Sequence, residues 1–374
     1  MSLTGQSYVV RSPGGPITLE TIHYDRIGDH EILVRTVAVS VCASDIKAAE
    51  GKFFMKPPMI LGHEGAGIVE EVGAKVTAFK RGDKVVLHYS SCKSCDACVT
   101  GGNPYCERME QLNFGGLRED NDSTKFATAA DGQSLSALFF GQSSMGQLAL
   151  ARETSAVKVD ATADELKLFA SLSCGIQTGA GAVLNVCKPP PGAAFAIFGA
   201  GAVGLAAVLA ARLCSPSHVI VIDISQKKLD LIPPGLATHT ICSLGSERGS
   251  VAAQLKEITE ARGVDYALDC AGLGELITEG FAALKKRGMV VSIGGGNTQA
   301  SLHTTEMLVK GATYRGTHQG DSVSQIFIPR LIKLWRSGQF PFHKLLSHYK
   351  LEDLPQVLDD LKNDRIMKPV LVST

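Results

Sequence analysis

The feature that most constrains the fold is a glycine-rich turn between a strand-like and a helix-like segment. The apolar stretch FAIF leads into FGAGAVG, which places Gly199, Gly201 and Gly204 in the spacing G-x-G-x-x-G. The first two glycines allow a tight turn and a close backbone approach to a pyrophosphate, and the third lets the next helix pack against the strand. The N-terminus of that helix faces the phosphates with partial positive charge. The pattern predicts a dinucleotide-binding turn, although an unrelated α/β protein can carry the same letters.

An acidic residue follows this turn at the distance that a dinucleotide site requires. Asp223 ends the next apolar stretch, HVIVID, and comes 22 residues after Gly201. A carboxylate there binds both hydroxyls of the adenosine ribose and repels a 2′-phosphate, which favours NAD over NADP. Lys227 and Lys228 follow closely and weaken this preference, and we count Lys228 among the expected cofactor contacts.

The two parts of the chain differ in their secondary-structure pattern. From about residue 176, the apolar runs AAFAIFGAG, HVIVIDIS, VDYALDCAG and GMVVSIGGG alternate with helix-like segments, which indicates a parallel sheet covered on both faces. Before it, EILVRTVAVSVC, GAGIVEEVG and GDKVVLHY are typical of strands in a β-barrel or irregular β domain. The tail from about 318 has two amphipathic segments and a strand-like KPVLV. The polar segment 117–132 predicts an exposed loop.

Charge and apolar runs exclude several classes of partner. Lys+Arg and Asp+Glu are both 37, so the chain lacks the basic balance that nucleic acids or anionic membranes require. Residues 193–211 carry no charge and are long enough for a membrane span, but the glycine fingerprint explains this run better. The N-terminal stretch lacks the pattern of a secretory signal. We therefore expect a cytoplasmic protein without a nucleic-acid or membrane partner.

Four of the ten cysteines form a closely spaced group. In SCKSCDACVTGGNPYC they have the spacing C-x2-C-x2-C-x7-C, as Cys92, Cys95, Cys98 and Cys106. The expected compartment disfavours disulfides, and a redox dithiol would need only two cysteines. Four thiolates complete a tetrahedral zinc shell without an open position, so we predict a structural zinc site. An iron–sulfur cluster and a nucleic-acid-binding zinc ribbon are the alternatives.

The remaining cysteines divide into two kinds. Cys42 follows a strand, and Cys174 stands just before the α/β part, while His63 lies in GHEGAG. A Cys, a His and a second Cys around one ion match a catalytic zinc with its fourth position open. Each residue alone is more often part of a core. The other four cysteines lie among apolar neighbours and are expected to be buried: Cys187, Cys214, Cys242 and Cys270.

Together these motifs resemble the zinc-dependent, medium-chain alcohol dehydrogenase family, from EILVRTVAVSVCASD to IMKPVLV. GHEGAG and the four spaced cysteines are its most specific markers, while CGIQTGAGAVLN, FFGQSS and GDSVSQIFIPRLI are most similar to aryl- (benzyl-) alcohol dehydrogenases. The resemblance implies an α/β protein with two domains. A GroES-like β-barrel catalytic domain would comprise residues 1–177 and 318–374 and hold both zinc sites. A Rossmann domain with a doubly wound parallel sheet would comprise residues 178–317, with the active site between the two domains.

The resemblance also assigns roles around the catalytic zinc, which Cys42, His63 and Cys174 would hold. Asp45 would accept the other ring N–H of His63, and Glu64 would lie behind the metal and exchange onto it. Ser44 would pass the alcohol proton outward, and its alternative role is that of a helix N-cap.

Lys47 stands where many relatives have a histidine. A protonated lysine cannot accept a proton, so either its pKa is depressed or the proton relay bypasses it. A solvated surface lysine is the alternative.

Further expected contacts concern the cofactor and the substrate. Thr178 would pack on the nicotinamide ring, Val203 would support its opposite side, and Lys368 replaces an arginine that some relatives use on the pyrophosphate. Gly294–Gly296 would lie near the nicotinamide half or form a plain turn. Candidate residues of the substrate pocket, which are otherwise core residues, are Phe114, Phe139, Phe140 and Met145.

The implied activity is the reversible oxidation of a primary, aryl or benzylic, alcohol to its aldehyde with NAD and two Zn²⁺ per chain. The metal would lower the pKa of the substrate hydroxyl, and a hydride would pass to the nicotinamide. One alternative is a biosynthetic enzyme that reduces an aldehyde or lactol, with NADPH as an alternative cofactor. The other is a zinc- and nucleotide-binding protein without turnover. We expect a homodimer or homotetramer.

Overall fold

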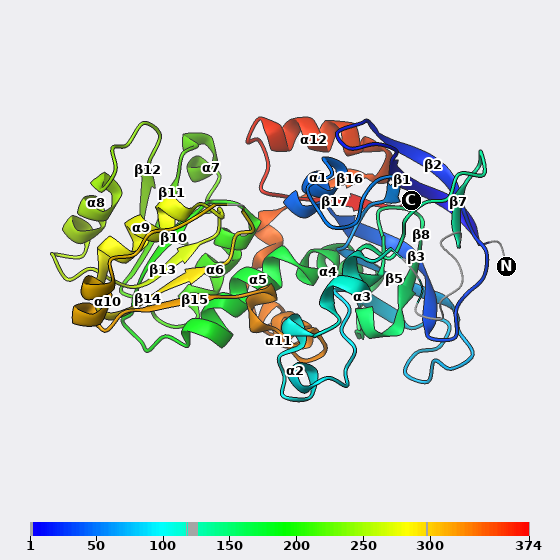
Figure 1. The fold of residues 1–374 in the computed structure, drawn as a ribbon, viewed down its shortest axis with the longest axis horizontal. Helices are drawn as coiled ribbons and strands as arrows, with labels where there is room; N and C mark the ends of the chain where they lie inside the picture. The colour runs from blue at the N-terminus through cyan, green and yellow to red at the C-terminus, as the bar shows by residue number, and fades with distance from the viewer. Residues whose placement is uncertain (1–2, 117, 119–125, 297, 374) are drawn as a thin grey trace.

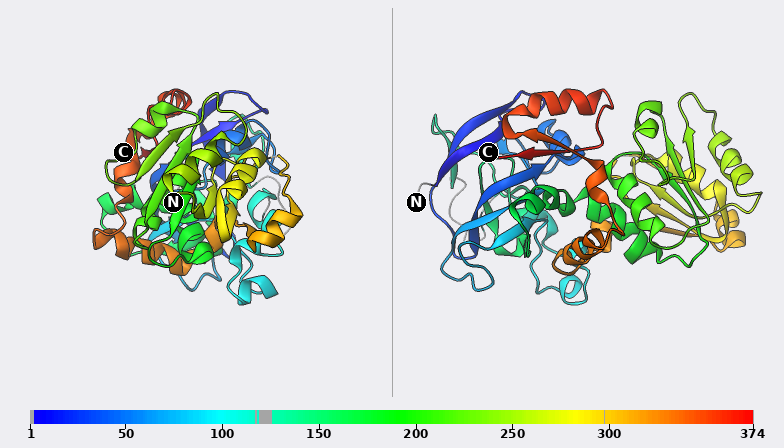
Figure 2. Two further views of the ribbon diagram at one scale, coloured as in Figure 1. Left: turned by 90° about the vertical axis from the view of Figure 1, so that its left-hand side faces the viewer. Right: turned by 180° about the vertical axis from the view of Figure 1, so that it is seen from behind.

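The computed structural model describes residues 3–116, 118, 126–296 and 298–373 and has two lobes (Figure 1). One lobe contains a parallel sheet, on the left in Figure 1. The other contains two sheets to which both ends of the chain contribute. Helices α5 and α11 lie between the lobes in this view and in the reverse view of Figure 2. This division supports the two predicted domains, whose bounds stay a prediction.

The parallel sheet has six strands in the order β12-β11-β10-β13-β14-β15, and all neighbouring strands run parallel. This is the strand order of a Rossmann fold, with the crossover point next to β10. The strands are β10 (Ala194–Phe198), β11 (His218–Asp223), β12 (His239–Cys242), β13 (Val264–Asp269), β14 (Leu284–Ser292) and β15 (Thr313–Gly316). The sequence predicted all of them except the two edge strands, β12 and β15.

Helices cover both faces of this sheet because its strands are apolar on both sides. Phe195 and Ile197 of β10 pack in the core that contains α6, whereas Ala196 and Phe198 pack in the core that contains α8 and α9. The helices are α6 (Ala202–Arg212), α7 (Gln226–Asp230), α8 (Ser250–Ile258), α9 (Gly274–Ala283) and α10 (Thr304–Lys310). The long apolar run 193–211 is therefore a strand, a turn and a helix. Within the described residues, no helix is both long and apolar enough to cross a membrane.

The other lobe is built on two sheets. A seven-stranded sheet has the order β16-β17-β3-β5-β6-β9, with β8 paired to β3, and a four-stranded sheet has the order β4-β1-β2-β7. The C-terminal β17 pairs antiparallel with β3, so the tail completes this lobe as predicted. The strands are β1 (Thr4–Val10), β2 (Ile17–Tyr24), β3 (Glu31–Ser40), β4 (Met59–Ile60), β5 (Gly65–Val72), β6 (Lys84–Leu87), β7 (Ala127–Ala129), β8 (Leu148–Arg152), β9 (Ala156–Lys158), β16 (Leu346–Lys350) and β17 (Lys368–Val372).

Helices of this lobe and of the junction carry some of the predicted site residues. The α-helices are α1 (Ala43–Ala49), α2 (Asp96–Val99), α3 (Met109–Phe114), α4 (Ala163–Phe169), α5 (Gly175–Gly181), α11 (Ser324–Arg336) and α12 (Leu354–Lys362). A π-helical turn, Ala182–Cys187, continues α5. Short 3-10 turns occur at Asn103–Tyr105, Phe139–Gly141, Glu153–Ser155, Ala170–Ser173, Gln319–Asp321, Phe342–Leu345 and Leu351–Asp353.

Two expectations from the sequence are wrong. The segment 117–132 is not simply an exposed loop, because Phe126 is buried and β7 pairs with β2. The guanidinium of Arg118 is also buried, 4.6 Å from the centre of the Phe126 ring, while residues 117 and 119–125 lie outside the described part. Cys242 is exposed rather than buried, because β12 is the outer strand of its sheet.

Candidate active site

One buried carboxylate organises two of the predicted zinc ligands. Cys42 is the N-cap residue of α1, and Asp45 lies in the first turn of that helix. Asp45 Oδ2 accepts a hydrogen bond from the Cys42 backbone N–H (3.0 Å). Its Oδ1 accepts from the Gly62 N–H (3.1 Å) and lies 2.9 Å from His63 Nδ1. Because a carboxylate can only accept, Nδ1 carries the proton and Nε2 is left as the donor atom for a metal.

The side chains present fit a zinc ion. The donor atoms of Cys42, His63, Glu64 and Cys174 all lie within 4.8 Å of one another. His63 Nε2 is buried without a hydrogen-bond partner, which is costly for a ring nitrogen unless a metal binds it. Thiolate sulfur and imidazole nitrogen together suit zinc. The structure therefore brings the three predicted ligands and Glu64 to one point.

The ionisation of these groups reflects their burial and proximity. A hydrogen bond from Cys174 holds the pKa of the Cys42 thiol well below its usual range and raises that of Cys174. The two thiols therefore interact strongly, and a divalent cation at this point would favour the thiolate form of both. Burial lowers the pKa of His63, but the Asp45 carboxylate and the Cys42 sulfur together raise it well above its usual value.

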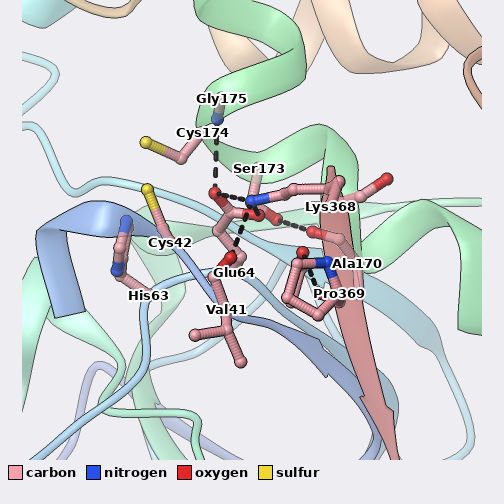
Figure 3. Close-up of polar contacts among 12 residues, drawn as sticks. Val41, Cys42, His63, Glu64, Ala170, Ser173, Cys174, Gly175, Lys368 and Pro369 are labelled. Atoms are coloured by element: carbon pink, nitrogen blue, oxygen red, sulfur yellow. Dashed lines mark hydrogen bonds and ion pairs between the residues drawn. The ribbon is translucent and has the colours of Figure 1, made fainter. Parts of the chain in front are cut away.

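Glu64 forms a buried ion pair with Lys368, from the first position of β17 (Figure 3). The Lys368 ammonium lies 2.8 and 2.7 Å from the two carboxylate oxygens and 3.2 Å from the Val41 carbonyl oxygen. Glu64 also accepts from the Gly175 backbone N–H (3.3 Å). Burial raises the pKa of Glu64 to about 7, and Lys368 opposes this only in part. The ammonium is thus bound to the residue behind the metal site, and its contact with the cofactor stays a prediction.

Aromatic rings pack on the His63 side of the site. The His63 ring stacks on Phe140, with ring centres 4.5 Å apart, and meets Phe139 edge-on at 5.4 Å. Phe114 contacts Phe140 at 5.0 Å, and Phe53 contacts Phe114 at 5.4 Å. We call Phe53, Phe114, Phe139 and Phe140 the aromatic cluster. Phe140 adopts a left-handed backbone (φ 52°), an unfavourable conformation that is typical of functional sites.

The first residues of α1 clarify two expectations. Ser44 is half-buried in the first turn of α1, and the N-cap is Cys42, so the alternative role of Ser44 as the N-cap is wrong. The Lys47 ammonium donates a hydrogen bond to the carbonyl oxygen of Gly295, which follows β14 in the other lobe. Lys47 therefore bridges the two lobes, and its part in proton transfer stays a prediction.

A residue that sequence reasoning missed lies beside Cys174 and Thr178. The Gln319 amide nitrogen is 3.7 Å from Cys174 Sγ, and its amide oxygen is 3.4 Å from the Thr178 hydroxyl. Both Thr178 and Gln319 are buried. A single glutamine in a loop carries no periodic or motif signal, so nothing in the sequence pointed to it.

The glycine turn has the geometry that a dinucleotide site requires. Gly199 has φ 102°, and a Cβ on Gly204 would lie 1.9 Å from the Gly199 carbonyl oxygen. Gly201 is the N-cap residue of α6, and a Cβ there would meet no atom within 4 Å, so the space that a pyrophosphate needs is open. Val203 is half-buried in the first turn of the same helix.

A cavity of about 570 Å³ adjoins this turn. Its lining includes Gly199, Asp223, Lys228 and Arg248. Asp223 accepts backbone hydrogen bonds from Ala200 (2.7 Å) and Ser225 (2.9 Å), which fix its carboxylate at the end of β11. The Lys228 ammonium lies 3.1 Å from an Asp364 oxygen, so the charges in the cavity wall partly balance.

The second cysteine group is also assembled. The sulfur atoms of Cys92, Cys95, Cys98 and Cys106 lie within 4.8 Å of one another, and all four residues are free of disulfides. The backbone N–H of Cys95 donates to Cys92 Sγ at 3.3 Å, which favours a thiolate there. The group fits a closed tetrahedral zinc site.

The segment around this group contacts the junction of the lobes. The Tyr105 hydroxyl donates to an Asp321 oxygen (2.6 Å) and accepts from the His318 backbone N–H (3.2 Å). The Lys93 ammonium donates to the Gln325 amide oxygen (2.9 Å). We call residues 92–106 the cysteine lobe.

Comparisons with known proteins agree with this architecture. Residues 28–159 match the family model described as alcohol dehydrogenase GroES-like domain, and residues 202–335 match that of zinc-binding dehydrogenase. The chain is 37% identical to geraniol dehydrogenase of Castellaniella defragrans, over 99% of this chain and 98% of that protein.

Two solved structures are similar over nearly their whole length. An alcohol dehydrogenase zinc-binding domain protein from Burkholderia ambifaria is 40% identical with a TM-score of 0.93, over 100% of this chain and 99% of that one. Benzyl alcohol dehydrogenase from Acinetobacter calcoaceticus is 34% identical with a TM-score of 0.91, over 99% of each chain. The protein therefore belongs to the zinc-dependent, medium-chain alcohol dehydrogenase family.

Proposed function

We propose that this enzyme interconverts primary aryl or benzylic alcohols and their aldehydes, with NAD as the hydride acceptor and a zinc ion held by Cys42, His63 and Cys174. The observation that carries this proposal is the position of the aromatic cluster, of which Phe139 and Phe140 pack directly on the side chain of the proposed zinc ligand His63. Flat aromatic groups pack favourably in offset or edge-on contact with such rings.

A bound zinc ion supplies a Lewis acid that lowers the pKa of an alcohol hydroxyl. Asp45 orients His63 toward the metal, and Ser44, in the first turn of α1, would carry the released proton outward. Thr178 lies one helical turn after Cys174, and Val203 lies in the first turn of α6, the helix that follows the dinucleotide turn. We propose that they hold the nicotinamide ring from its two sides.

The preference for NAD is supported by Asp223, whose carboxylate is fixed at the end of β11 where a ribose would bind. Lys228 and Arg248 line the same cavity and could favour a 2′-phosphate, but Asp364 already pairs with Lys228.

The cysteine lobe would hold a second, structural zinc, which makes two ions per chain. The proposal includes assembly into a homodimer or homotetramer: the edge strand β15 is exposed, and Leu308, Val309 and Tyr314 are exposed apolar side chains near it. It also includes a cytoplasmic location, which the ten free cysteines support.

The test is NADH formation by purified protein with measured zinc content, using benzyl alcohol, geraniol and ethanol as substrates. We expect benzyl alcohol to give a kcat/KM at least tenfold above that of ethanol, and NAD to exceed NADP. A preference for geraniol over benzyl alcohol would replace the aryl assignment by one for an acyclic alcohol, as the name of the 37% identical relative suggests. Absence of turnover with all three, at full zinc content, would refute the proposed substrate class and direct the search to NADPH-dependent aldehyde reduction.

A further inference from the structure

The side chain of Gln319 has a fixed orientation at the junction of the lobes. The Gln177 amide nitrogen donates to the Ser173 carbonyl oxygen, so the orientation of the Gln177 amide is set by the backbone. The same nitrogen lies 3.2 Å from one amide atom of Gln319, and that atom must be oxygen because Gln177 can only donate there. The other amide atom of Gln319 is therefore nitrogen, and it faces Cys174 Sγ at 3.7 Å.

We propose that Gln319 is a positioning residue for the catalytic metal, because its amide N–H donates to the sulfur of the ligand Cys174. This inference rests on the zinc site proposed above. A hydrogen bond to a ligating thiolate stabilises the charged form and fixes the direction of its lone pairs. Loss of such a partner typically costs about 10- to 100-fold in metal affinity.

The backbone of Gln319 is held in place from several sides. Gln319 has φ 54°, a left-handed conformation that a side chain other than glycine adopts only where the surroundings impose it. The next residue, Gly320, packs on α5 so closely that a Cβ on Gly181 would lie 2.3 Å from the Gly320 carbonyl oxygen. Asn185 donates to the same carbonyl oxygen at 3.0 Å.

The cysteine lobe fixes the other side of this segment. Tyr105, next to Cys106, contacts both His318 and Asp321, which flank Gln319 and Gly320. Contacts thus connect the group of four cysteines, through Tyr105 and the segment 318–321, to Cys174, a proposed ligand of the catalytic zinc. The cysteine lobe therefore holds the residues on both sides of Gln319 and Gly320.

The test measures zinc release rather than turnover. Zinc-loaded protein is mixed with a chromogenic chelator, and Cys174→Ser identifies the phase that belongs to the catalytic ion. Gln319→Glu keeps the size of the side chain but removes the N–H, and Gln319→Met removes both polar ends without adding charge. We expect both to release the catalytic ion about tenfold faster or more, with the phase of the cysteine lobe unchanged. In cobalt-substituted protein, both should also shift the sulfur-to-metal charge-transfer band.

Gln325→Glu is the matched control, because it makes the same chemical change in the same region, and Gln325 contacts His88 and Lys93 instead of Cys174. It should release the catalytic ion at the wild-type rate. Release from both Gln319 variants within about twofold of wild type would overturn the inference. A wild-type protein that holds one zinc, with no loss in Cys174→Ser, would instead refute the proposed catalytic site.

Discussion

Replacing Lys368 by methionine tests the buried ion pair directly. Methionine keeps most of the length and apolar volume of the lysine stem, so the main change is loss of the ammonium beside Glu64. Both side chains are almost fully buried, with exposed fractions of 2% and 0%. Breaking a buried pair from one side typically costs about 3–5 kcal/mol, because the remaining charge loses its partner. The Gly175 N–H still stabilises the carboxylate, so we expect the lower end, about 3 kcal/mol.

The assay is urea-induced unfolding of the zinc-loaded protein, followed by circular dichroism, with zinc content measured before each experiment. A fall in the midpoint with an unchanged slope reports a change in stability rather than in the extent of unfolding. The double variant Lys368→Met with Glu64→Gln removes the charge and its partner together. The new amide would retain an oxygen for the Gly175 N–H, so the double variant should recover about 1–3 kcal/mol of the loss.

Two results would refute this reasoning. If Lys368→Met costs less than about 1 kcal/mol, the ammonium does not compensate the carboxylate. If the double variant is as unstable as the single one, the cost comes from lost packing around the lysine stem rather than from an unpaired charge.

The other predictions concern separate parts of the site. Gly179→Ala would place a Cβ 2.0 Å from the Val203 carbonyl oxygen, so α5 must move away from α6; we expect a loss of about 1–3 kcal/mol in thermal unfolding and a weaker NADH affinity in fluorescence titration. Asp45→Asn should weaken binding of the catalytic zinc about 10- to 100-fold in a chelator competition, since the imidazole loses a charged acceptor. Phe140→Leu should raise KM for benzyl alcohol roughly three- to tenfold and leave that for ethanol nearly unchanged; equal effects on both would argue against an aryl-binding role. Cys98→Ser should lower the zinc content measured by atomic absorption from two ions to one while the catalytic ion stays bound.

The parts of the structure that the sequence predicted are those with local constraints. A Cβ on Gly204 would collide with the carbonyl oxygen of Gly199, five residues earlier, so the spacing of these glycines reports a backbone geometry directly. The cysteine lobe was also predictable from local sequence, because its four cysteines lie within 15 residues, from 92 to 106, and the short segment between them brings their sulfur atoms together. The parallel sheet was predictable for the same reason. A strand that is buried on both faces has a continuous apolar sequence, so each strand can be recognised from its own residues.

The contacts that the sequence did not reveal join residues far apart in the chain. Lys368 and Glu64 are 304 positions apart, Lys47 and Gly295 are 248 apart, and Gln319 and Cys174 are 145 apart. Each is a single polar pair without a periodic pattern, so neither partner indicates the other. The edge strands β12 and β15 escaped prediction for a different reason, since they are short and most of their residues are exposed, so neither forms a continuous apolar run.

The charge balance of the site explains why Lys368 is where it is. Two thiolates, from Cys42 and Cys174, would neutralise the proposed zinc dication, and the Asp45 carboxylate accepts hydrogen bonds from the His63 N–H and two backbone N–H groups. Glu64 then adds one negative charge in a region from which water is excluded, and an unpaired charge there is very costly. Lys368 is the cation that cancels the charge of Glu64, whereas the charge of Asp45 is stabilised by hydrogen bonds alone. Because Glu64 and Lys368 enter this balance as a pair, neither should tolerate replacement alone, whereas their joint replacement by uncharged residues should be tolerated better.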